Sequence, residues 1–104
     1  MHTFTLGEFG TRICMKYTKH GKHRAVERGI SEDVILKAIS EPTFSYYDLS
    51  SGTSIVFKKL DEKHLLMVYS REDDEIKVVT TFITSVAREL VDRKLKSNVW
   101  VKIR

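Results

Sequence analysis

The chain has 104 residues, of which 41% are hydrophobic and 31% charged, and its formal net charge at pH 7 is +4. This size and mix are typical of one soluble globular domain over residues 1–104 and exclude a second domain. No apolar run approaches the roughly 20 residues of a membrane span, and the first ten residues lack the basic and apolar regions of a signal peptide. We therefore expect a cytoplasmic protein that contacts no membrane. The positive charge permits a polyanion or an acidic protein as partner without requiring either.

The single cysteine, Cys14, cannot form an internal disulfide, which agrees with a reducing compartment. We expect it to be an inert core thiol. His20 and His23 form an H-x-x-H pair, but zinc would need more ligands, and His2, His64 and the acidic residues are scattered along the chain. We expect no metal site and no cofactor.

The first predicted elements in chain order are one short strand and two helices. Alternating apolar residues predict a strand over residues 12–17. Thr18 can cap the helix that follows, and Gly29 can supply the left-handed residue that ends it. Ser31 can cap a second helix, which has acidic residues in its first turn and which Pro42 stops.

After this point the spacing of apolar residues changes from about four to two. Short alternating runs separated by polar turns cover residues 43–48, 54–60, 64–70 and 75–83. They predict an antiparallel meander of three or four strands, and apolar residues on both strand faces indicate that most of the sheet is covered. A last helix is expected to begin at Thr84 or Ser85. Residues 98–104 alternate again, as a short edge strand or an ordered tail, with Trp100 packed on its own sheet.

The order of these elements predicts an α+β domain whose helices lie on one face of an antiparallel sheet. One stretch, YTKHGKHRAVERGIS at residues 17–31, carries His20, Arg24 and Arg28 at a spacing of four. At helical pitch the three lie on one stripe, about 100° from the apolar stripe of the same helix. Gly29 places Arg28 at the carboxyl end of the helix, where the dipole favours a cation, so this arginine also has a purely structural explanation.

The same stretch resembles a small family of uncharacterised bacterial and archaeal domains. Their signature is a His, an Arg four residues on, a second Arg four further on, and then Gly-Ile-Ser; a proline closes the next helix and the last sheet strand reads like KVVTTF. All of these are present here, as His20, Arg24, Arg28, residues 29–31, Pro42 and residues 77–82. The resemblance covers most of the chain, with Gly21 as a mild departure that weakens the helix.

That family is similar to the RelE/ParE and BrnT toxins of toxin–antitoxin systems, which share a compact scaffold of helices and an antiparallel sheet. Many of these toxins cut RNA without a metal, whereas ParE-type toxins poison DNA gyrase. The resemblance implies a RelE-like scaffold, free or ribosome-bound RNA as substrate, and an antitoxin protein as partner. It implies the scaffold more firmly than the activity.

Metal-free RNA cleavage needs proton transfer and cations that hold the phosphorane charge, which histidine and arginine supply. Our hypothesis is a metal-independent ribonuclease that leaves 2′,3′-cyclic phosphate ends. In it His20 is the general acid or base, and Arg24 and Arg28 bind phosphate. Candidate substrate-binding residues are Lys19, His23, Lys58, Tyr69, Thr80 and Thr81, of which the last three are expected on the sheet face below the histidine.

Two alternatives remain open. Arg24 can pair with Glu27 or Asp33, which would make the stripe a solvated face, and His20 can merely bridge the helix to the sheet. At the level of function, the alternative is a non-enzymatic module on the same scaffold, which binds a protein target as gyrase poisons do, or which binds nucleic acid.

Overall fold

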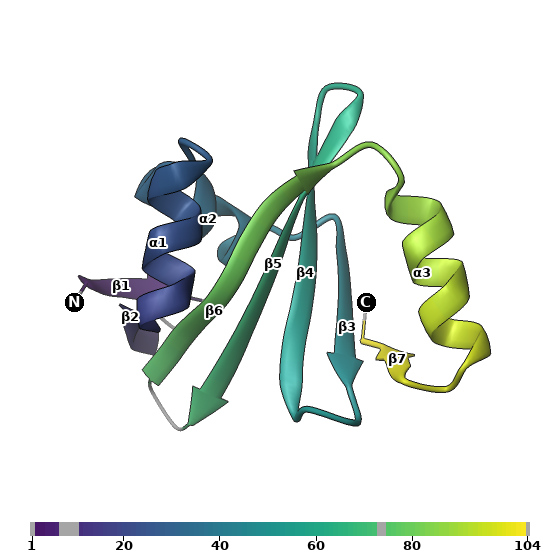
Figure 1. Cartoon of the computed structure of the whole chain (residues 1–104). Coiled ribbons are helices and arrows are strands. Elements are labelled where there is room, and N and C mark those ends of the chain that lie inside the picture. The colour runs from purple at the N-terminus through teal and green to yellow at the C-terminus, as the bar shows by residue number, and fades with distance from the viewer. Residues whose placement is uncertain (1, 7–10, 73–74, 104) are drawn as a thin grey trace.

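Figure 1 shows the computed structural model, which describes residues 2–6, 11–72 and 75–103, with side chains from Met15 onward; the side chain of Cys14 therefore lies outside the described residues. Its elements are β1 (His2–Leu6), β2 (Thr11–Tyr17), α1 (Lys19–Glu27), α2 (Glu32–Ser40), β3 (Phe44–Asp48), β4 (Thr53–Leu60), β5 (Lys63–Glu72), β6 (Glu75–Thr84), α3 (Ala87–Lys96) and β7 (Trp100–Lys102). The predicted α+β class, with two helices before the meander and one after it, is confirmed. None of the helices in the described ranges is long and apolar enough to cross a membrane.

The strands of the described ranges form one sheet in the order β1-β2-β6-β5-β4-β3-β7. The strands from β3 to β6 pair antiparallel, as the meander prediction requires. In contrast, β2 pairs parallel with β6, so the sheet is mixed and not antiparallel. At the far edge, Trp100 of β7 is buried and its ring stacks on Tyr46 with the centroids 5.7 Å apart. This confirms that the tryptophan packs on its own sheet.

The helices cover both faces of this sheet, and the prediction of a single helical face is wrong. Residues of α1 and α2 share a buried cluster with Leu65 and Met67 of β5, whereas residues of α3 share a second cluster with Leu66. Successive residues of a strand point to opposite faces, so α3 packs on the face opposite α1 and α2, and Figure 1 shows it at the other side of the sheet. The cause is the apolar content of the central strands, in which residues 55–57 and 65–67 are all buried.

The ends of the first two helices follow the predicted local chemistry. The side chains of Thr18 and Ser31 each accept a hydrogen bond from a backbone N–H three residues on, at 2.9 and 3.3 Å, and Gly29 is left-handed, with φ 64°. The last helix begins at Ala87, later than predicted, because Thr84 still belongs to β6. Both helices therefore begin at the capping residues that the sequence predicts. The predicted stripe of His20, Arg24 and Arg28 lies on α1 and its C-cap residue.

Candidate active site

The start of α1 is fixed on β6, just beyond the point where β2 stops pairing with that strand. Pairing of β2 with β6 ends at Val78. The backbone N–H of Thr18 donates to the Val78 carbonyl at 2.9 Å, and its hydroxyl donates to the Val79 carbonyl at 3.3 Å. The helix approaches so closely that a Cβ at Gly21 would overlap the Val78 carbonyl oxygen. The first turn of α1, which carries the predicted catalytic histidine, therefore has a fixed position on the sheet.

The histidines of α1 belong to a network of side chains on the outer side of the helix. Nε of Arg24 donates to Nε2 of His20 at 3.4 Å, and its Nη1 donates to Oε1 of Glu27 at 3.2 Å. Nε2 of His23 forms an ion pair with the other carboxylate oxygen of Glu27 at 3.0 Å. Of the alternatives left open by the sequence, the Arg24–Glu27 pair is present, and the described hydrogen bond of His20 stays on its own helix.

The two histidines have different partners in this network. Nε2 of His20 accepts the hydrogen bond from Nε of Arg24. Nε2 of His23 instead lies next to the Glu27 carboxylate, to which an imidazole N–H can donate. An imidazole nitrogen that accepts and an imidazole N–H that donates are the two groups that a general base and a general acid require. Within the described residues, no group of three or more His, Cys, Asp or Glu side chains could hold a metal ion.

Arg28 points away from this network, although it lies on the same stripe. Its Nη1 donates to the Thr81 carbonyl at 2.7 Å, and its guanidinium carbon lies 5.7 Å from the centroid of the Phe82 ring. It is also two helical turns from His20, about 12 Å along the axis. These contacts tie the carboxyl end of α1 to β6, and they explain Arg28 without a role in binding the phosphate next to His20.

The other candidate substrate-binding residues do not gather around the histidine. Lys58 is half-buried, and its ammonium donates to the carbonyl of the C-cap residue of α2 at 2.7 Å. Tyr69 and Thr81 lie on the face that carries α1 and α2, but Thr80 lies on the opposite one. The three therefore do not share a sheet face, contrary to the prediction. Only Lys19, exposed at the start of α1, is next to the network.

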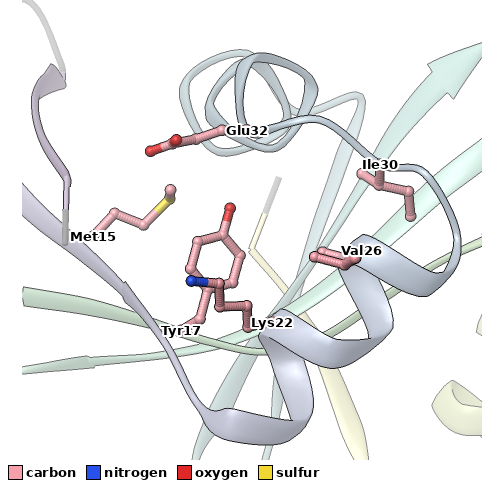
Figure 2. Close-up of a pocket in the computed structure, with 7 residues that line it drawn as sticks. Met15, Tyr17, Lys22, Val26, Ile30 and Glu32 are labelled. Carbon is pink, nitrogen blue, oxygen red and sulfur yellow. The ribbon is translucent and has the colours of Figure 1, made fainter.

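A hollow of about 270 Å³ lies on another side of α1, and the sequence did not indicate it. It is lined by Met15, Tyr17, Lys22, Ala25, Val26, Ile30 and Glu32. Figure 2 shows the Tyr17 hydroxyl pointing toward the Glu32 side chain. Burial, and then the Glu32 charge, raise the pKa of Tyr17, so at neutral pH the phenol is a hydrogen-bond donor and not a base. None of the three predicted catalytic residues lines this hollow.

Comparison with known proteins places the chain in a family. A family model described as "Domain of unknown function (DUF4258)" matches residues 17–83, more than half of the chain. The chain belongs to this family. The part of the chain that matches the family begins at the first residue of the YTKHG stretch and ends in β6, so it contains α1, α2 and the meander and leaves out α3 and β7. No curated protein and no solved structure matches the chain.

Proposed function

We propose that the chain is a toxin-type, metal-independent endoribonuclease of a toxin–antitoxin system, with free or ribosome-bound RNA as substrate and an antitoxin protein as partner. The observation that carries the proposal is the network of His20, Arg24, Glu27 and His23 on α1. It combines two imidazoles and a guanidinium within two turns of one helix. The resemblance of residues 17–31 to a family that is similar to the RelE/ParE and BrnT toxins, many of which cut RNA without a metal, supports the reaction class.

In the proposed reaction, Nε2 of His20 takes the proton of the RNA 2′-hydroxyl. The 2′-oxygen attacks the neighbouring phosphorus, and the bond to the 5′-oxygen breaks. Protonated His23 gives its proton to that leaving oxygen, so the products are a 2′,3′-cyclic phosphate and a 5′-hydroxyl. The guanidinium of Arg24 exchanges its contact with His20 for a non-bridging phosphate oxygen, where a charge-assisted hydrogen bond stabilises the transition state.

The charge of α1 supports a phosphate at this place. Near the network the helix carries two cations, Lys19 and Arg24, against the single carboxylate of Glu27. His20 lies in the first turn, where the positive end of the helix dipole favours an anion. Arg28 has a structural role in this proposal and none in the reaction, because its contact with the Thr81 carbonyl holds the helix on the sheet.

The test is cleavage of a mixed RNA and of ribosome-bound messenger RNA in EDTA, with the new termini mapped. Wild type is expected to leave cyclic phosphate ends. His20→Ala is expected to slow cleavage about 100-fold or more, since general acid–base catalysis contributes that much, and to leave the melting temperature unchanged because the side chain is exposed. Lys22→Ala, an exposed cation on another side of the same helix, is the matched control.

Three results would separate the alternatives. Failure of the folded wild type to cut either substrate would contradict the proposal. DNA damage signalling on expression, without loss of RNA, would favour a gyrase-type inhibitor. Arg28→Met is expected to behave in the opposite way to His20→Ala, with a lower melting temperature and retained cleavage, because its contacts are with β6.

A further inference from the structure

A groove of about 450 Å³ lies on the sheet face opposite α1, and its lining residues come from α3 and from the strands β3, β5 and β7. Three aromatic side chains, Phe44, Tyr46 and His64, line it from the sheet. Three charged side chains, Arg88, Asp92 and Lys102, line it from α3 and β7. None of these residues takes part in the network around His20, so the proposed cleavage does not account for the groove.

Two of the aromatic rings, those of Phe44 and His64, lie next to each other, and both residues are at least partly exposed. Phe44 is 37% exposed, and the centroid of its ring lies 5.8 Å from that of the His64 imidazole at an interplanar angle of 31°. Both rings contact the buried Phe57 in edge-to-face geometry, at 6.5 and 6.4 Å. Because the buried Phe57 supports both rings from the core, the exposed faces of Phe44 and His64 keep a fixed orientation.

The groove carries two cations and one carboxylate. These charges suit a polyanion whose negative groups are separated by uncharged parts. Within the described residues, neither Arg88 nor Lys102 forms an ion pair, so both cations are available to an anionic ligand. Asp92 lies among them and disfavours a phosphate beside its carboxylate, but it can accept a hydrogen bond from an N–H group. The groove thus combines an aromatic surface, two available cations and one acceptor.

We propose that this groove binds single-stranded nucleic acid, with one base stacked on Phe44 and His64. Arg88 and Lys102 contact the flanking phosphates, and Asp92 accepts a hydrogen bond from the base. Aromatic surfaces bordered by cations are the usual combination for single strands, since every base has a π-face and every linkage a charge. The binding is independent of the proposed cleavage, because α1 and the groove lie on opposite faces of the sheet.

The chain contains its own reporter for this binding. Trp100 is the only tryptophan, and it stacks on Tyr46, which lines the groove. A short single-stranded RNA, a DNA of the same sequence and a ribose-phosphate strand without bases are titrated against the His20→Ala protein, in which we expect cleavage to be too slow to interfere with the titration. RNA is expected to change the tryptophan emission, and the strand without bases is expected to bind at least tenfold more weakly. Equal binding of RNA and DNA identifies base and phosphate as the ligand, whereas a preference for RNA adds the 2′-hydroxyl; both support the proposal.

Phe44→Leu keeps an apolar side chain but removes the flat ring, and it is expected to weaken RNA binding about tenfold. Tyr47→Leu is the matched control, because Tyr47 lies on the same strand and is also 37% exposed, but it points to the other face. Arg88→Gln is expected to reduce the salt dependence by about 0.7 in the log–log slope. Lys37→Gln, at an exposed position on α2, should leave that slope unchanged.

Three outcomes would overturn the proposal: equal binding of the strand without bases, equal effects of Phe44→Leu and Tyr47→Leu, or displacement of RNA by an acidic peptide whose own binding requires Phe44. The last would assign the groove to a protein partner. Wild type that binds RNA in the groove but does not cut it would count against the proposed nuclease alone. Wild type that cuts RNA but does not bind it in the groove would count against the groove alone.

Discussion

Thr81 combines complete burial with a hydroxyl that has no hydrogen-bond partner among the described residues. The residue lies on the sheet face that carries α1, where its own backbone carbonyl accepts a hydrogen bond from Arg28. The hydroxyl of its side chain has no such hydrogen bond within the part of the chain that the structure describes. A buried polar group without a partner costs roughly 1–3 kcal/mol, so the hydroxyl of Thr81 lowers the stability of the fold.

Replacing this threonine by valine should therefore stabilise the protein. Thr81→Val removes the hydroxyl with little change of shape, and we expect the free energy of unfolding to rise by about 1 kcal/mol, measured by urea denaturation. Thr80→Val is the control, because Thr80 is half-buried on the opposite face and gains the same strand propensity. Equal gains in the two variants would assign the effect to propensity, and loss of RNA cleavage in Thr81→Val would restore its predicted role in substrate binding.

Single residues were predictable from the sequence as far as their partners are local. The spacing of His20 and Arg24 predicted that they would share a side of one helix, and a pair between Arg24 and Glu27 was one of the open alternatives. The structure brings the three side chains together. The partner of Arg28 is Thr81, which is 53 residues away in the chain. A contact of this kind has no periodic signal, and only the glycine that follows Arg28 indicated a structural role.

Among the elements, the packing of α1 on β6 depends on the absence of a side chain at Gly21. From the sequence this glycine is only an unfavourable helix residue. In the structure it faces the Val78 carbonyl, which already accepts a hydrogen bond from the Thr18 N–H. The contact joins the backbone of α1 to the backbone of β6, and neither can move away easily. The helix can therefore start at this place only because residue 21 has no side chain.

Gly21→Ala should destabilise the protein although it improves helix propensity. Alanine gains about 1 kcal/mol in an exposed helix, but overpacking against backbone costs typically 1–3 kcal/mol, and here the overlap is with a carbonyl oxygen. We expect a net loss of about 1 kcal/mol or more in thermal or urea unfolding. Lys22→Ala, the exposed neighbour, should be neutral or slightly stabilising. A more stable Gly21→Ala protein would contradict the observed approach of α1 to β6.

The pairing of elements was less predictable than their existence. The pattern of residues 54–60 and 64–70 correctly predicted two central strands. The apolar residues on both faces of these strands correctly indicated that other elements cover both faces of the sheet. The parallel pairing of β2 with β6 had no signal, because periodicity defines which face a residue occupies and not which strand lies beside it. The same limit concealed the groove, whose residues come from β3, β5, α3 and β7.

At the scale of the molecule, Asp48 joins the turn after β3 to the carboxyl-terminal strand. Its Oδ1 accepts hydrogen bonds from the Ser50 hydroxyl at 2.6 Å and from the Ser50 and Ser51 amides, and Oδ2 accepts from the Trp100 indole at 3.2 Å. The bond from the Ser50 side chain, followed by the amides and the indole, lowers the pKa of Asp48 below its usual 3.8, against a smaller opposing effect of burial. The folded state therefore favours the ionised carboxylate.

This shift predicts a pH-dependent contribution to stability. Because the folded pKa is depressed, the contribution is fully present above about pH 5 and is lost as the pH falls through the folded pKa. Asp48→Asn should be less stable than wild type at about pH 7, and the difference should shrink toward about pH 2, with urea unfolding followed by Trp100 emission. Glu62→Gln, an exposed carboxylate in the turn between β4 and β5, is the control. A constant difference between Asp48→Asn and wild type at all pH values would show that ionisation plays no part.

The parallel pairing of β2 with β6 also determines the order in which the chain can fold. Thr18 and the carbonyl of Val79 that it contacts are 61 residues apart, so the amino-terminal strands and α1 have no complete docking surface until β6 has been synthesised. The meander of β3 to β6 contains its pairings within itself and can form first. We therefore expect the segment that carries His20 and Arg24 to reach its final position only after β6 has been synthesised. The docking of α1 on β6 would then complete the folding of the amino-terminal half and form the proposed active site in one step.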